Sequence, residues 1–207
     1  MEKRVLGKSG LEVSVSRRQA LTRALSLPLA AGLILSATPS LAQSGRTGVK
    51  VLVAHFSRTG NTRVIAGQIR RAHGADIFEI VPATPYPDDY EATVRQATRE
   101  RDSEYEPPLA ANVPNIAAYD TVFLGFPIWG ASAPAVIRSF LAQHDLSGKT
   151  LVPFITHGGY GPGNSLGTLA RLAPRARILD GLTMRADQER ETLSQVTRWL
   201  GGIKVAG

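Results

Sequence analysis

The stretch that decides the fold is Val51-Leu52-Val53-Ala54-His55-Phe56-Ser57-Arg58-Thr59-Gly60-Asn61-Thr62. The apolar run over residues 49–56 predicts a buried strand, and the segment over residues 63–69 predicts an amphipathic helix. The turn between them carries three hydroxyls, one amide and one glycine. Backbone N–H groups converge at the N-terminus of such a helix, where the macrodipole favours an anion. The turn therefore predicts a phosphate-binding site; the alternative is an ordinary N-capped helix.

From residue 49 onward, apolar runs of strand length alternate with helical patterns, which favours βαβ units and a parallel sheet. The expected strands are Val49–Phe56, Asp76–Val81, Thr121–Phe126, Leu151–Thr156 and Arg177–Leu182. The expected helices are Asn61–His73, Asp88–Arg101, Pro134–Gln143, Asn164–Leu172 and Asp187–Leu200. The segment over residues 82–118 is too long for a simple connection, so it predicts an insertion with one surface helix. The fold class is a five-stranded, doubly wound α/β sandwich over residues 43–207.

Three loops follow strands of this sheet at their carboxyl ends, where doubly wound sheets bind ligands. The first is the turn over residues 57–62. The second is Pro127-Ile128-Trp129-Gly130-Ala131-Ser132, and the third is His157-Gly158-Gly159-Tyr160-Gly161-Pro162-Gly163. A phosphate-binding turn, a tryptophan loop and a glycine-rich loop with an aromatic together suit a phosphorylated planar ligand.

Three motifs in this order resemble the flavodoxin family. The turn Ser57–Thr62 resembles its fingerprint Thr/Ser-x-Thr-Gly-x-Thr, and the stretches over residues 123–130 and 153–159 resemble the second and third loops of one branch. The resemblance covers residues 49–200. It implies strand order 2-1-3-4-5 with helices on both faces of the sheet, and FMN bound non-covalently.

The resemblance also implies the residues that bind this cofactor. The residues implied to bind the phosphate of FMN are Ser57, Arg58, Thr59, Gly60, Asn61 and Thr62. The residues implied to contact the flavin ring are Pro127, Ile128, Trp129 and Gly130 on one side and His157, Gly158, Gly159 and Tyr160 on the other.

Several of these residues have a plain structural alternative. Trp129 could be a core aromatic, Tyr160 an exposed loop aromatic, His157 a helix cap and Arg58 a solvated charge. His55 is expected to be a packed core histidine. Tyr86 and Tyr90 in the insertion are candidates to cover the site. No catalytic side chain is expected, because the flavin itself carries the redox chemistry.

The implied function is electron transfer with an unidentified redox partner protein or small-molecule acceptor. Residues 43–207 hold 18 Lys/Arg and 15 Asp/Glu, a net charge of +3. Electron-shuttling flavodoxins are usually strongly acidic, so this charge weakens the shuttle interpretation. The alternative is an NAD(P)H-dependent quinone or flavin reductase on the same fold, although no second nucleotide-binding fingerprint is present.

Other classes are poorly supported. The chain has no cysteine, which excludes disulfides, thiolate metal sites and cysteine nucleophiles. Its arginines are scattered, which argues against nucleic acid, and no metal-ligand spacing is present. The segment Gly163-Asn164-Ser165-Leu166-Gly167 fits the serine hydrolase pattern, but all four histidines precede Ser165, whereas that fold needs its histidine last.

The N-terminal 42 residues predict an export signal. Arg17-Arg18 precede a moderately apolar run over residues 24–37, and Ser40-Leu41-Ala42 forms a peptidase site. The pattern resembles a twin-arginine signal, so we expect cleavage after Ala42, a periplasmic location in a bacterium and no stable membrane span afterwards. Residues 4–14 resemble the opening of aldo/keto reductases. They are interpreted as a fusion remnant or a misplaced start with no function of their own.

Overall fold

The computed structural model describes residues 48–185 and 189–203. The export signal expected over residues 1–42, and the first two residues of the helix expected over residues 187–200, lie outside the described residues. None of the helices in the described ranges combines the length and the apolar character that crossing a bilayer requires.

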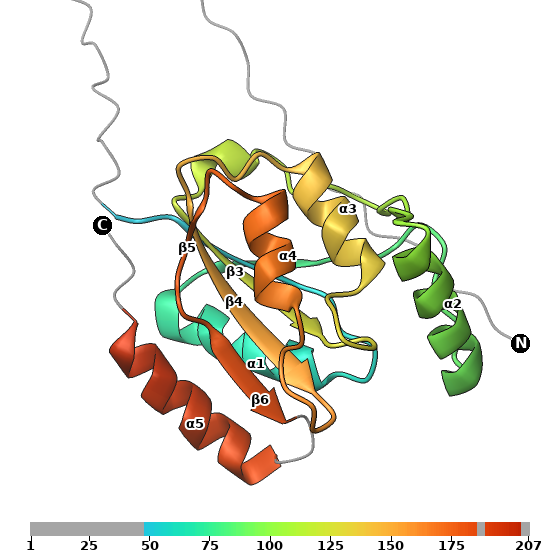
Figure 1. The fold of residues 1–207 in the computed structure, drawn as a ribbon. Helices are drawn as coiled ribbons and strands as arrows, with labels where there is room; N and C mark the ends of the chain where they lie inside the picture. The colour runs from blue at the N-terminus through green and yellow to red at the C-terminus, as the bar shows by residue number, and fades with distance from the viewer. Residues whose placement is uncertain (1–47, 186–188, 204–207) are drawn as a thin grey trace, which may run out of the picture. The chain divides into compact units, whose positions relative to one another are not determined.

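A parallel sheet forms the centre of the fold (Figure 1). Its strands are β1 (Val51–His55), β2 (Asp76–Glu79), β3 (Thr121–Pro127), β4 (Thr150–His157), β5 (Arg177–Ile178) and β6 (Leu182–Arg185). The strand order is β2-β1-β3-β4-β5, with β6 also paired to β4, and every pairing is parallel. The order 2-1-3-4-5 is therefore confirmed.

The single fifth strand expected over residues 177–182 is wrong in one respect, because it is divided into β5 and β6. These two short strands pair with successive parts of β4, at Thr150–Leu151 and at Phe154–His157. Pro153 lies between the two pairings and has no N–H to give to a ladder. A Cβ on Gly181 would lie 2.1 Å from the Pro153 carbonyl oxygen. The chain therefore passes close to β4 there without pairing.

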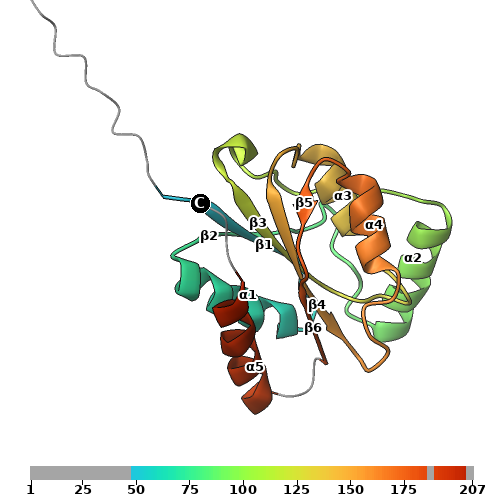
Figure 2. The ribbon, with the colours of Figure 1, turned by 60° about the vertical axis from the view of Figure 1, so that its left-hand side comes forward.

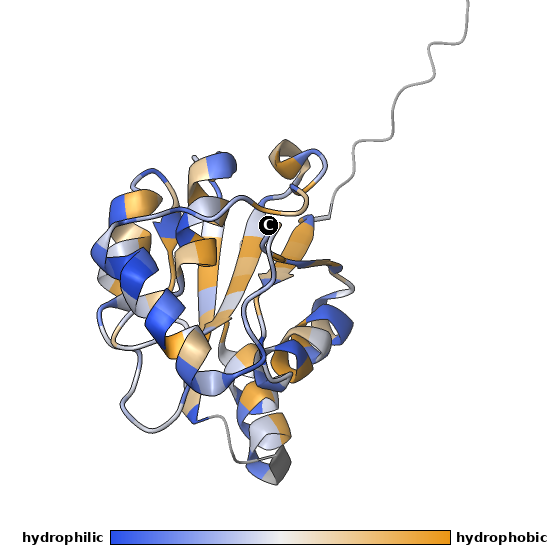
Figure 3. Cartoon of the chain, turned by 90° about the vertical axis from the view of Figure 1, so that its right-hand side faces the viewer, coloured by the Kyte–Doolittle hydropathy of each residue, from blue (hydrophilic) through white to orange (hydrophobic). Residues whose placement is uncertain are grey.

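Helices cover both faces of the sheet (Figures 1 and 2). The helices α1 (Asn61–His73) and α5 (Glu189–Gly202) lie on one face, and α3 (Ala135–Gln143) and α4 (Ser165–Leu172) on the other. Each face has its own apolar core, because successive residues of a strand point to opposite faces. Val53, Ile65 and Phe123 belong to the first core, and Leu52 and Phe140 to the second. Figure 3 shows the apolar residues concentrated in the sheet.

The insertion over residues 82–118 carries the expected helix, α2 (Tyr90–Asp102), and a short 3-10 helix, η1 (Ile116–Ala118). The carboxylate of Asp89 caps α2 by accepting the N–H of Ala92 at 2.7 Å. Unlike the other helices, α2 lies beside α3 rather than on the sheet (Figure 1). It buries Thr93 and Glu100 and no apolar side chain. Its position therefore does not come from the hydrophobic core.

Candidate functional site

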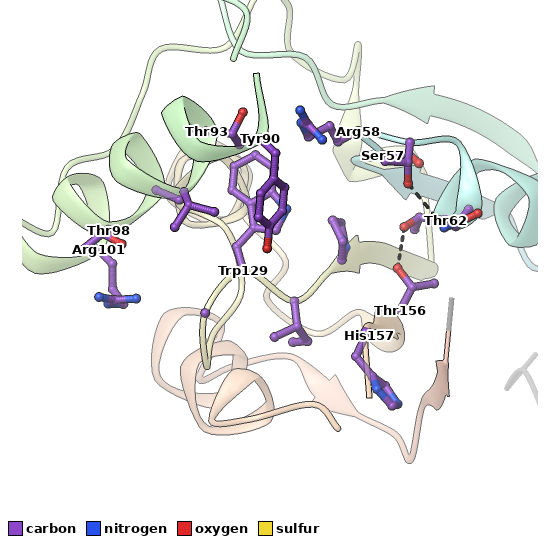
Figure 4. Close-up of a pocket in the computed structure, with 18 residues that line it drawn as sticks. Ser57, Arg58, Thr62, Tyr90, Thr93, Thr98, Arg101, Trp129, Thr156 and His157 are labelled. Atoms are coloured by element: carbon purple, nitrogen blue, oxygen red, sulfur yellow. Dashed lines mark hydrogen bonds between the residues drawn. The ribbon is translucent and has the colours of Figure 1, made fainter. Parts of the chain in front are cut away.

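A cavity of about 300 Å³ lies at the carboxyl ends of β1, β3 and β4 (Figure 4). Its walls come from the turn after β1, the loop after β3, the end of β4 with the loop that follows, and helix α2. The lining residues are Ser57, Arg58, Thr59, Asn61, Thr62, Tyr90, Thr93, Val94, Ala97, Thr98, Arg101, Pro127, Ile128, Trp129, Gly130, Thr156, His157 and Gly158. This is the edge at which doubly wound sheets bind ligands.

The cavity brings together eleven of the fourteen residues predicted to bind the cofactor. The other three, Gly60, Gly159 and Tyr160, are not among the lining residues. Gly60 forms the backbone of the first turn, and Gly159 lies in the third loop. The side chain of Tyr160 is 98% exposed, so in this structure it does not close the cavity.

The turn after β1 is organised by its own side chains. Gly60 is the N-cap of α1 and has φ +94°, a left-handed conformation that favours glycine. The Ser57 hydroxyl accepts the N–H of Gly60 at 3.1 Å, and the Asn61 amide donates to the Thr59 hydroxyl at 3.3 Å. No side chain caps the N-terminus of α1, and its first turn has no acidic residue. This end of the helix therefore suits an anion.

The two arginines near this turn are both engaged. Arg58 donates to the main-chain carbonyl of Asp88, just before α2, and so links the turn to the insertion. Arg63 forms an ion pair with Glu79 and is not among the lining residues. Arg58 therefore lines the cavity but is held by the protein, rather than being fully solvated.

The tryptophan loop makes a tight turn in which the N–H of Trp129 donates to the Ser132 carbonyl at 3.0 Å. The Trp129 ring packs edge-on against Phe56 and Tyr86, with ring centroids 5.3 Å and 4.6 Å away. The Tyr86 hydroxyl in turn donates to the buried Glu100 carboxylate at 2.8 Å. Burial and this carboxylate raise the pKa of Tyr86 well above its ordinary value. Trp129 is thus held in place and also lines the cavity.

The third loop is arranged around His157. Its Nδ1 accepts the backbone N–H groups of Gly159 at 3.0 Å and Gly161 at 3.2 Å. In neutral histidine this leaves the proton on Nε2, so the ring has a donor to offer. The second and third loops also meet, because the N–H of Asn164 donates to the Ala131 carbonyl at 2.9 Å.

Two predictions outside the cavity can be compared with the structure. His55 is a packed core histidine, as predicted, with 2% of its surface exposed. Burial lowers the pKa of His55, and the Glu79 carboxylate opposes this effect in part. Ser165 is completely buried at the start of α4, so its hydroxyl is out of reach of a substrate. Together with the order of the histidines, this excludes the serine hydrolase alternative. Within the described ranges, no group of His, Asp and Glu side chains could hold a metal ion.

The sequence did not predict that residues on one face of α2 together line the cavity. This α2 wall consists of residues at helical spacing: Tyr90, Thr93, Val94, Ala97, Thr98 and Arg101. The only signal was Tyr90, named as a candidate cover without a partner. Thr156, at the end of β4, was also missed. Its hydroxyl lies 2.9 Å from that of Thr62.

The fold and the site define a doubly wound α/β protein with a ligand cavity at the carboxyl edge of its sheet. The chain belongs to the flavodoxin family, because the family model described as Flavodoxin matches residues 50–203.

Solved structures with the same fold extend this comparison. A candidate flavoprotein from Bacteroides eggerthii is 35% identical, with a TM-score of 0.67 over 77% of this chain and 100% of that chain. Another from Bacteroides uniformis is 31% identical, with a TM-score of 0.66 over 74% and 99%. A flavoprotein from Lactobacillus acidophilus in complex with FMN is 20% identical, with a TM-score of 0.58 over 71% and 99%. No curated protein matches this chain.

Proposed function

We propose that this protein binds FMN non-covalently in the cavity and carries electrons through it. One observation carries the proposal. The uncapped N-terminus of α1, with the hydroxyls of Ser57, Thr59 and Thr62 beside it, shares one cavity with the Trp129 loop. A phosphate site and a site for a flat ring therefore lie together. The fold shared with an FMN-bound flavoprotein is consistent with this ligand.

The residues present fit both ends of FMN. The first turn offers hydroxyl and backbone donors without a carboxylate that would repel a phosphate. The ring end offers Ile128 and Trp129 as apolar contacts, and the same cavity is lined by Gly158, where a Cβ would meet nothing within 4 Å. When bound, FMN accepts and donates one or two electrons.

The chain's own residues have the tasks of binding and positioning. The hydroxyl of Thr59, and that of Thr62 while it keeps its bond to Thr156, would hydrogen-bond the phosphate, and the orphan N–H groups at the start of α1 would share its charge. Trp129 and Ile128 exclude water from the ring. The Nε2–H of His157 is the donor available to a carbonyl oxygen of the ring.

Titration of FMN with the purified full-length protein tests the proposal. We expect the fluorescence of FMN to be quenched at stoichiometric protein. Riboflavin, which lacks the phosphate, is the matched control ligand and should bind at least about tenfold more weakly. A protein that quenches neither compound would contradict the proposal, and equal binding of both would contradict the assignment of the phosphate site.

A second candidate function is an NAD(P)H-dependent quinone or flavin reductase. The α2 wall favours it, because its side chains add to the cavity a surface beyond the turn and the two loops assigned to FMN, and small-molecule sites are lined clefts of this kind. Oxidation of NADPH by the FMN-loaded protein, with a quinone as acceptor, distinguishes the two functions. If NADPH is oxidised no faster than with free FMN, the reductase function is ruled out and electron transfer remains the proposed function.

We also propose that the protein is exported through a twin-arginine system, on the basis of Arg17-Arg18 and the following apolar run. Such systems carry folded proteins, so FMN could be bound before export. Replacement of both arginines by lysine should retain the precursor in the cytoplasm. Unchanged recovery from the periplasm would contradict this route.

A further inference from the structure

Helix α2 is held in place by buried polar groups. Removing these groups from water costs free energy, and α2 buries no apolar side chain that would offset this cost. The Arg138 guanidinium, 7% exposed, donates to the carbonyls of Glu100 and Tyr105, both at 2.7 Å. The Glu100 carboxylate, 5% exposed, accepts from Tyr86 and Gln96, both at 2.8 Å. Burying charged groups is costly unless each is satisfied. Because α2 adds no buried apolar side chain to the core, these polar groups rather than apolar packing fix the face that it presents.

That face lines the cavity and is incompletely covered. Tyr90 and Val94 are 67% and 40% exposed although they line a cavity. An exposed aromatic and an exposed aliphatic side chain, one helical turn apart, form a surface that a flat apolar molecule would cover. In Figure 4, α2 lies on the opposite side of the cavity from Ser57 and His157. Arg101 is therefore remote from the turn assigned to the phosphate, whereas Tyr90 lies two residues after Asp88, whose carbonyl Arg58 of that turn contacts.

A positive charge lies at the other end of the same wall. The Arg101 guanidinium lines the cavity and lies against Gly130, where a Cβ would come within 2.7 Å of its Nη1. Asp102 pairs with this guanidinium at 3.0 Å, but 42% of the Arg101 side chain remains exposed. The Thr98 hydroxyl lines the cavity one turn before it. The wall thus combines an apolar half with a half that can hold an anionic oxygen.

We propose that the α2 wall binds the second reactant of the flavin, a planar aromatic molecule with an anionic group, through Tyr90 and Val94 at its ring and Arg101 at its charge. This inference rests on the proposed function, since it assigns the partner of a bound FMN. Because the cavity of about 300 Å³ is assigned to FMN, the second reactant would lie over its open rim, against the exposed side chains of Tyr90, Val94 and Arg101. Sulfonated quinones and nicotinamide nucleotides share this chemistry.

Calorimetric titration of the FMN-loaded, oxidised full-length protein tests the proposal without turnover. The probes are 1,4-naphthoquinone-2-sulfonate, uncharged 2-methyl-1,4-naphthoquinone, and NAD⁺, which stands in for NADH because NADH would reduce the bound FMN. Arg101→Gln should weaken the sulfonate at least about tenfold and leave the uncharged quinone nearly unchanged. Tyr90→Ala should weaken both quinones. Arg99→Gln changes the same charge two residues away, outside the cavity lining, and should leave all affinities unchanged.

The outcomes separate this inference from the proposed function. FMN binding by the wild type is measured first, by fluorescence quenching; its failure removes the proposed function. If FMN binds and no probe does, the α2 wall is not a reactant site. If Tyr90→Ala or Arg101→Gln weakens FMN itself by more than about tenfold, the wall belongs to the flavin and the inference is overturned. NAD⁺ binding that depends on Arg101 supports the inference and assigns the wall to a nicotinamide electron donor; sulfonate binding alone assigns it to an acceptor.

Discussion

The hydroxyl of Thr62, in the first turn of α1, lies 2.9 Å from the hydroxyl of Thr156, near the end of β4, and both side chains are buried. This hydrogen bond joins the proposed phosphate turn to the carboxyl end of β4. The two residues are 94 positions apart in the chain. The bond therefore fixes the relative positions of the first and third loops of the site.

Replacing Thr156 by valine removes this bond and leaves a buried hydroxyl on Thr62 without a partner. We expect the free energy of unfolding to fall by about 1–2 kcal/mol, measured by urea denaturation without FMN. The matched test is the cycle with Thr62→Val, which should give a coupling energy of about 1 kcal/mol. Strictly additive effects would show that the two hydroxyls do not stabilise each other.

A second prediction concerns the contact between the second and third loops. Gly163 has φ +55°, and a Cβ there would lie 2.1 Å from the Ala131 carbonyl oxygen. Gly163→Ala should therefore lower the free energy of unfolding by at least about 2 kcal/mol. Gly167→Ala is the control, because a Cβ there meets nothing within 4 Å inside α4. It should instead stabilise the protein by up to about 1 kcal/mol.

A third prediction concerns the attachment of α2. Arg138→Met removes two hydrogen bonds, to the main-chain carbonyls of Glu100 and Tyr105. We expect amide exchange over residues 90–102 to increase at least about tenfold, corresponding to a local loss of about 1.5–3 kcal/mol. Exchange in β1, β3 and β4 should change less. Arg175→Met, at an exposed ion pair with Asp145, is the control and should leave α2 unaffected.

The response to acid follows from two buried histidines. Burial lowers the pKa of His55 and His144 below the ordinary value of 6.5, and that of the partly buried His73 in the same direction. The unfolded chain therefore binds protons that the folded chain does not, and stability is lost as the pH falls below 6.5 towards these lowered values. Each histidine contributes a slope of at most about 1.4 kcal/mol per pH unit.

Urea unfolding of the wild type and of His55→Leu between pH 7.5 and 5 measures this slope. The variant lacks the proton that His55 takes up on unfolding, so its free energy of unfolding should fall less steeply as the pH is lowered. His144 is expected to add a further loss, because its Nε2 accepts the N–H of Val113 at 2.9 Å and protonation would end that bond. The same slope in both proteins would contradict the assignment to His55.

The fold could be predicted because its signals are local. The buried run before Ser57, the turn with Gly60 and the helix after it follow one another within about twenty residues, and the loops after β3 and β4 repeat the pattern. The division of the fifth strand could not be predicted, since it depends on Gly181 lying against Pro153 in another strand. The α2 wall could not be predicted for a similar reason, because it too depends on contacts between residues far apart in the sequence. The bond between Arg138 and Glu100 joins residues 38 positions apart, and spacing alone does not show which face of a polar helix meets a cavity.

The attachment of α2 has a consequence for how this fold can change. No residue of the segment from Tyr90 to Asp102 belongs to either apolar core. Substitutions along its cavity face are thus uncoupled from the stability of the sheet, provided that Glu100 and Arg138 are kept. Substitutions on this face of α2 can therefore change which ligand the cavity binds while the sheet and its two apolar cores keep their structure.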